Sequence, residues 1–103
     1  MSVLHDLFTT IQARKAEGGT ESWTAKLLAQ GPEKCAEKFG EEAIEAIIEA
    51  VKGDKAALRS EAADVLYHLL VMLAARDVSL PEVEEVLAQR VGTSGIAEKA
   101  SRS

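Results

Sequence analysis

The stretch from Val65 to Ala75 constrains the fold of this chain more than any other sequence feature. Drawn as a helix, it is apolar nearly all the way round. A helix that is apolar on every side is buried on every side, and a chain of 103 residues can hardly surround it alone. We therefore expect a homodimer in which this helix lies near the shared core.

The apolar spacing is helical along the chain, and no segment shows the period of two that indicates a strand. The expected helices run from Val3 to the glycines at 18 and 19, from Trp23 to Ala29, from Pro32 to about Lys52, from the N-cap Asp54 to about Arg76, and from the capping box at Ser79 to near Gly92. We expect one all-α domain over residues 1–92 and a flexible polar tail over 93–103. The loop at Gly53 is very short, which predicts an antiparallel hairpin of the third and fourth helices.

Composition excludes several functional classes. A net charge of −5 argues against a nucleic-acid surface, which normally carries a basic stripe. The longest apolar stretch, Leu69 to Ala75, is too short to span a bilayer. The single cysteine, Cys35, cannot form an intrachain disulfide, and we expect it to be half-buried. No secretory signal is evident at residues 1–6, so the expected location is the cytoplasm, without nucleic-acid or membrane partners.

Acidic residues gather on one arc of the third expected helix and at one point of the fourth. They are Glu42, Glu45 and Glu49 on the third helix and Glu61 and Asp64 on the fourth. The opposite face of the third helix consists of Ile44, Ile47, Ile48 and Val51. The Glu61–Asp64 pair leads directly into an apolar stripe that begins at His68. We therefore expect the pair to face the neighbouring helix rather than open water.

Carboxylates at such close quarters repel one another and lose hydration, which requires cations or raised pKa values. Hard oxygen ligands suit Mg²⁺ or Mn²⁺, and Mg²⁺ keeps coordination positions for water and phosphate oxygens. This favours metal-assisted phosphoryl chemistry. The alternative is that a glutamate-rich arc is an ordinary solvated surface, and spacing alone does not decide between the two.

Nearby residues have structural and functional interpretations. Glycine inside a helix costs about 1 kcal/mol relative to alanine. Gly40 therefore either relieves a crowded helix contact or admits a ligand, and we favour the packing explanation. We interpret His68 as a hydrogen-bond partner of the site or a packed residue rather than a ligand or base. Tyr67 and Met72 are predicted core residues.

The acidic pattern also resembles a known signature. Glu41-Glu42-x-x-Glu45, followed after fifteen residues by Glu61-x-x-Asp64, resembles the signature of the MazG-like nucleoside triphosphate pyrophosphohydrolases. More narrowly, the segments Ser22 to Leu28, Gly31 to Lys34, Lys38 to Glu45 and Glu61 to Leu70 resemble the phosphoribosyl-ATP pyrophosphohydrolases. The match covers roughly residues 3 to 91 in the same order. Trp23 stands where we expect tyrosine, and Cys35 where an aliphatic residue is usual.

The resemblance implies a MazG-like helical bundle whose central antiparallel hairpin is completed by dimerisation. It implies Mg²⁺-dependent hydrolysis of the α–β phosphate bond of phosphoribosyl-ATP, the second step of histidine biosynthesis, with Mn²⁺ as a substitute ion. The implied metal ligands are Glu42, Glu45, Glu61 and Asp64. Glu41 is the candidate catalytic residue that orients water, with a salt bridge to a lysine as its alternative. The candidate substrate contacts are Trp23, Thr24, Lys26, Lys34 and Lys38, with a solvated surface as the alternative for Lys26 and Lys34.

Two other functions fit part of the pattern. A MazG-like enzyme that removes aberrant nucleoside triphosphates would share the metal chemistry, and only the segment from Ser22 to Lys26 favours phosphoribosyl-ATP over its substrates. A non-catalytic acidic helical dimer would need no metal and would tolerate loss of the acids.

Overall fold

The computed structural model describes residues 2–19 and 21–91, and these residues form helices and no strand. The helices are α1 (Val3–Glu17), α2 (Trp23–Ala29), α3 (Pro32–Lys52), α4 (Lys55–Ala75) and α5 (Leu80–Val91). The all-α prediction is therefore confirmed. The predicted end of the last helix at Gly92 and the predicted tail over 93–103 lie outside the described residues. None of the described helices has the length and apolar character needed to cross a membrane.

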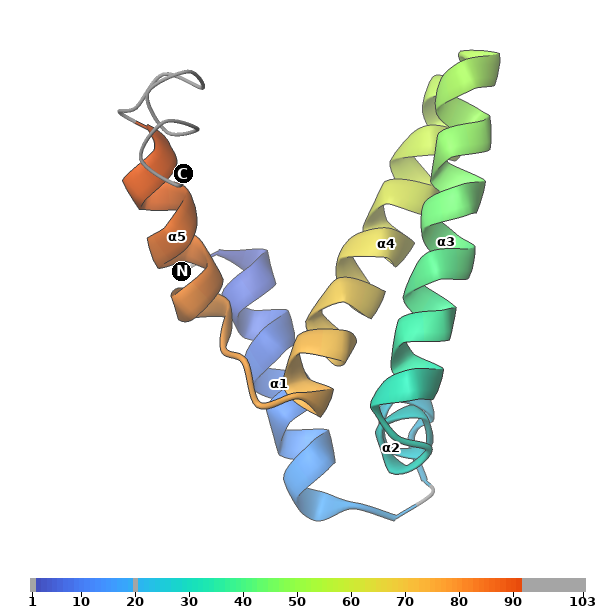
Figure 1. Ribbon diagram of the computed structural model, residues 1–103. Coiled ribbons are helices and arrows are strands. Elements are labelled where there is room, and N and C mark those ends of the chain that lie inside the picture. The colour runs from blue at the N-terminus through green and yellow to red at the C-terminus, as the bar shows by residue number, and fades with distance from the viewer. Residues whose placement is uncertain (1, 20, 92–103) are drawn as a thin grey trace.

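Local capping explains where these helices begin and end. The Ser22 hydroxyl accepts a hydrogen bond from Ala25 N at the start of α2, and the Asp54 carboxylate accepts one from Ala57 N at the start of α4. Gly53 ends α3 at φ 79°, a left-handed conformation that suits glycine. The chain reverses within two residues, so α3 and α4 lie antiparallel and side by side, as predicted (Figure 1).

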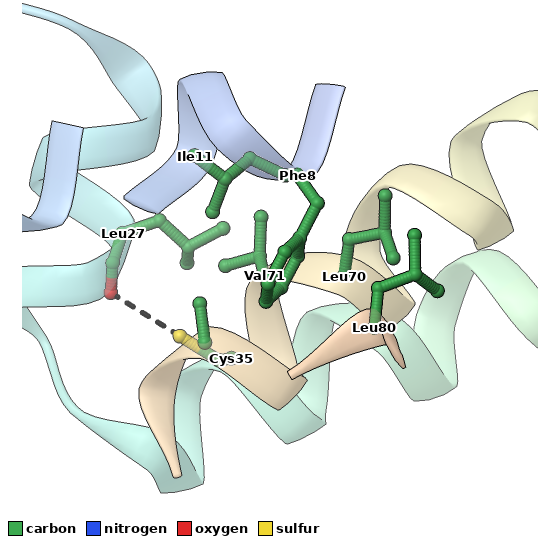
Figure 2. Close-up of a cluster of buried hydrophobic side chains, with 8 residues drawn as sticks. Phe8, Ile11, Leu27, Cys35, Leu70, Val71 and Leu80 are labelled. Atoms are coloured by element: carbon green, nitrogen blue, oxygen red, sulfur yellow. Dashed lines mark hydrogen bonds between the residues drawn. The ribbon is translucent and has the colours of Figure 1, made fainter. Parts of the chain in front are cut away.

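Figure 1 shows the hairpin of α3 and α4 as one arm of a V, with α1 and α5 in the other arm and α2 beside the foot of α3. His5 Nε2 lies 2.8 Å from a Glu84 carboxylate oxygen and links α1 to α5. The buried core sits at the foot of the V. Its members are Phe8, Ile11, Leu27, Cys35, Leu70, Val71, Ala74 and Leu80 (Figure 2).

Cys35 is fully buried, so the prediction that it would be half-buried is wrong. Its position in the first turn of α3 places it beneath α2, where the Sγ thiol donates a hydrogen bond to Leu27 O at 3.5 Å (Figure 2). Burial raises the pKa of this thiol. Tyr67 and Met72, the other predicted core residues, are partly buried and pack against the core.

The upper part of the hairpin leaves much of its apolar surface open. The side chains Ile44, Ile47, Ile48 and Val51 are between 49% and 83% exposed. On α4, Leu66 is 42% exposed, although His68 and Leu70 below it are buried. A single chain therefore does not enclose α4 on every side.

Candidate metal centre

Three carboxylates meet between α3 and α4. Glu42 and Glu45 lie one turn apart on α3, and Glu61 reaches them from α4. One oxygen of each lies within 4.8 Å of the others. Glu42 and Glu61 are half-buried whereas Glu45 is exposed, so the cluster is open to solvent on the side of Glu45.

The short turn of the hairpin brings these three carboxylates together. Glu45 lies eight residues before Gly53, and Glu61 lies seven residues after Asp54, so both stand at about the same level of the hairpin. The acidic arc of α3 therefore faces α4, and its isoleucines face outward. This is the reverse of an ordinary surface helix, which turns its apolar face inward.

The cluster is electrostatically unfavourable without a cation. Desolvation raises the pKa of Glu42 to about 7, with further contributions from the Glu45 carboxyl and the charge of Asp64. Desolvation and the charge of Glu45 also raise the pKa of Glu61. Glu61 Oε2 is buried and finds no hydrogen-bond partner within the described part of the chain.

These features fit a hard divalent cation. The donors are all carboxylate oxygens, which Mg²⁺ and Mn²⁺ prefer. A cation would neutralise the repulsion that otherwise favours a proton on Glu42, and it would give the orphaned Glu61 oxygen a partner.

Asp64 is the one predicted ligand that the geometry leaves outside this group. It is exposed, one turn along α4 from Glu61. Its negative charge nevertheless acts to raise the pKa values of Glu42, Glu61 and His68. The expectation that the Glu61–Asp64 pair turns away from water is therefore wrong for Asp64, which lies exposed beside the cluster. Its role as a ligand stays a prediction.

The predicted residues on the first half of α3 form ion pairs along the helix. Lys38 Nζ lies 3.3 Å from Glu41 Oε2, the salt bridge that we considered as the alternative role of Glu41. Lys34 Nζ lies 3.2 Å from Glu37 Oε2 in the same arrangement. Both lysines are partly exposed. These ion pairs do not test the catalytic role of Glu41 or the substrate-binding roles of the lysines, which stay predictions.

The predicted residues on α2 separate into exposed and tethered side chains. Trp23 is 52% exposed, and Lys26 is also exposed. The Thr24 hydroxyl instead forms a hydrogen bond with the Tyr67 hydroxyl of α4. The sequence predicts a substrate contact for Thr24 and a core position for Tyr67. The only sequence signal for their pairing is the Tyr67 hydroxyl within the nearly all-apolar segment from Val65 to Ala75.

His68 is a packed residue, as one of our two interpretations held. It is only 7% exposed, and the Tyr67 ring meets it edge-on with centroids 4.9 Å apart. Burial lowers the pKa of His68, and the negative charge of Asp64 partly opposes this shift. Its Nδ1 has no hydrogen-bond partner among the described residues.

Gly40 lies in open space. A Cβ atom built there would meet no atom within 4 Å. The prediction that this glycine relieves a crowded helix contact is therefore wrong within one chain, since the space beside α3 at this level is free.

Comparisons with known proteins cover all of these elements. The family model described as phosphoribosyl-ATP pyrophosphohydrolase matches residues 4–91. The phosphoribosyl-ATP pyrophosphatase of Ruegeria pomeroyi is 74% identical over 102 residues, which span 99% of this chain and 97% of that protein. Proteins of the same name from Cereibacter sphaeroides and Dinoroseobacter shibae are also 74% identical, and the matches span 99% of this chain and 99% and 100% of those proteins.

Proposed function

The chain belongs to the phosphoribosyl-ATP pyrophosphohydrolase family, and from that premise we propose that it hydrolyses phosphoribosyl-ATP at the carboxylate cluster between α3 and α4. Water cleaves the α–β phosphate bond and releases pyrophosphate and phosphoribosyl-AMP. The reaction is the second step of histidine biosynthesis. We expect it in the cytoplasm, a reducing compartment that suits the free thiol of Cys35.

The observation that carries the proposal is the meeting of Glu42, Glu45 and Glu61 within 4.8 Å. We propose that these residues hold Mg²⁺, or Mn²⁺ in its place, and that the nearby Asp64 completes the ligand set. When bound, the ion would supply Lewis-acid activation of the phosphate groups. The half-buried setting strengthens this electrostatic effect, because water screens the charges less.

The remaining polar residues position the substrate and the water. Lys34 and Lys38 present positive charge on the same helix as the acids, and Lys26 does so from α2. Such charges bind a polyphosphate and stabilise the negative charge that develops on departing pyrophosphate. We propose that Glu41, held by Lys38, orients the attacking water and accepts its proton as the bond to the bridging oxygen breaks.

We also propose that the enzyme is a homodimer in which a second copy covers the outward face of the hairpin. The support is the contiguous row of exposed apolar residues on α3 from Ile44 to Val51. Monomeric proteins seldom leave such rows uncovered. Sedimentation at micromolar concentration tests this, and a monomer there would contradict it.

Substitution of single acids tests the site. We expect Glu45→Gln to abolish Mg²⁺-dependent pyrophosphate release, since a neutral amide replaces a ligand, and Asp64→Asn to do the same. Circular dichroism should show unchanged helix content in both variants. Glu85→Gln is the control for loss of an exposed carboxylate, because Glu85 lies on α5, outside the cluster and the proposed substrate contacts. Full activity in the first two variants would show that the proposed ligand set is wrong.

Turnover of competing substrates tests the specificity. The chain should hydrolyse phosphoribosyl-ATP faster than dATP or dUTP. Faster hydrolysis of the deoxynucleotides would instead identify an enzyme that removes aberrant nucleotides. No pyrophosphate release from any of them would leave the non-catalytic dimer as the explanation.

A further inference from the structure

Helix α2 depends on the rest of the fold for its position. It has only seven residues, and helices shorter than roughly 12–15 residues are marginal by themselves. Glycines flank both of its ends: Gly18 and Gly19 precede the helix, and Gly31, at φ 97°, follows it. The segment can therefore change direction easily at either end, and its tertiary contacts decide how it lies.

Two kinds of contact hold α2. The side chains of Ala25 and Leu27, which project from different sides of the helix, are buried in the core. At its first turn, the Thr24 hydroxyl bonds to the Tyr67 hydroxyl across the gap to α4. The apolar contacts are not directional, whereas the hydrogen bond has a preferred geometry and therefore adds a specific restraint on the orientation of the helix.

This hydrogen bond reaches α4 one turn beyond Asp64. Tyr67 lies three residues after Asp64, so the two side chains occupy neighbouring turns on one side of the helix. The Tyr67 ring also contacts the buried ring of His68, which limits its movement. The bond thus joins α2 to the turn of α4 that follows Asp64, six residues along the helix from Glu61.

We propose that Thr24 and Tyr67 are positioning residues, whose hydrogen bond orients α2 so that Trp23 and Lys26 face the substrate at the metal centre. The proposal rests on the proposed function. It gives Thr24 a role different from direct substrate contact, because its hydroxyl already bonds to Tyr67. Trp23 and Lys26 flank this tether on the exposed side of the same short helix.

Loss of the tether should weaken substrate binding without altering the chemistry. Removing one hydroxyl in Tyr67→Phe or Thr24→Val should raise KM roughly fivefold, the fold-change expected for one hydrogen bond. The value of kcat at saturating Mg²⁺ should stay within about twofold, because the carboxylates keep their places. The double variant should be no worse than either single variant, since both remove the same bond.

Matched variants distinguish the effect of losing the hydrogen bond from the effect of changing the side-chain volume. Thr24→Ser keeps the hydroxyl and should restore KM relative to Thr24→Val. Thr10→Val is the control for loss of a threonine hydroxyl elsewhere, because the Thr10 hydroxyl donates a hydrogen bond within its own helix, to Asp6 O at 3.1 Å. It should leave KM at the wild-type value.

A second measurement needs no activity. Trp23 is the single tryptophan of the chain and lies on α2, so its fluorescence reports on this helix. Quenching of Trp23 by acrylamide should increase in Tyr67→Phe and Thr24→Val and return toward the wild-type level in Thr24→Ser. All experiments use the full chain.

The two measurements keep the possible failures apart. If the wild-type chain is active but the variants match it in KM and in quenching, only the tether is overturned. A raised KM with unchanged quenching also overturns it, since the hydroxyls would then contact the substrate directly. An inactive wild-type chain would overturn the proposed function and, with it, the substrate role of the tether.

Discussion

Glu42 shows at the scale of one residue how a binding site opposes folding. Its carboxyl lies half-buried beside Glu45 and Glu61, and its pKa rises to about 7 from an ordinary value of 4.5. In the metal-free protein below about pH 7, a proton on Glu42 therefore relieves the repulsion that we propose a cation relieves. Such local strain is expected where function rather than stability maintains a cluster of like charges.

This shift predicts how the stability of the metal-free protein depends on pH. The folded state holds the Glu42 proton more tightly than the unfolded state does. The resulting stabilisation is complete below about pH 4.5 and is lost as the pH rises through about 7. Glu42→Gln should remove this part of the pH dependence. Thermal unfolding in EDTA, at pH steps from 4.5 to 8, measures the difference between the two proteins.

Saturating Mg²⁺ should oppose this loss in the wild type, because the ion binds the deprotonated cluster. The Glu42→Gln variant should gain less from Mg²⁺. Identical pH profiles for the wild type and the variant in EDTA would show that Glu42 ionises normally in the folded protein.

Residue spacing predicted much of the site, but not all of it. The meeting of Glu42, Glu45 and Glu61 follows from helical periodicity and a short turn, both of which are local features. The position of Asp64 outside the group depends on the angle at which the two helices pack. The Thr24–Tyr67 bond and the burial of Cys35 depend on where α2 lies on the hairpin, which no local pattern specifies.

At the scale of the element, α3 illustrates the same distinction. Its ends were predictable because Pro32 in its first turn and Gly53 after its last turn act through neighbouring residues. Its two faces were also predictable from periodicity. Which face is exposed could not be settled by the same pattern, because an apolar arc usually turns inward. In this structure the acids face α4 and the isoleucines face solvent.

The open space at Gly40 gives a prediction for this helix. Gly40→Ala should raise the free energy of unfolding by about 1 kcal/mol, because alanine is the better helix former and its Cβ meets no atom within 4 Å. Urea denaturation of the metal-free protein, at one fixed protein concentration, measures this free energy of unfolding. Ala50→Gly, an exposed position on the same helix, should lower the value by a similar amount. A less stable Gly40→Ala variant would show that another chain packs against this position.

The whole molecule has its core at one end and an open apolar surface at the other. The buried residues gather at the foot of the V, where α1, α2 and α4 meet. The uncovered row on α3 lies along the other arm, away from this core. The sequence pointed to a dimer through α4, whereas the structure adds α3 as the more exposed apolar surface.

Ile47 is the position at which the dimer can be tested most directly. It is 61% exposed in one chain and lies in the middle of the apolar row. Burying such a side chain contributes about 1.5–3 kcal/mol per copy. Two copies of Ile47→Glu should thus weaken association at least about a hundredfold. Sedimentation velocity at micromolar concentration should show a dimer for the wild type and a monomer for the variant.

Val3→Glu provides the control for a new surface charge, since Val3 is 81% exposed at the start of α1 on the other arm. It should remain dimeric. The Ile47→Glu monomer should still bind Mg²⁺, because Glu42, Glu45 and Glu61 all come from one chain. Calorimetric titration with Mg²⁺ measures this, and loss of the ion together with the dimer would show that the second copy supplies part of the metal centre.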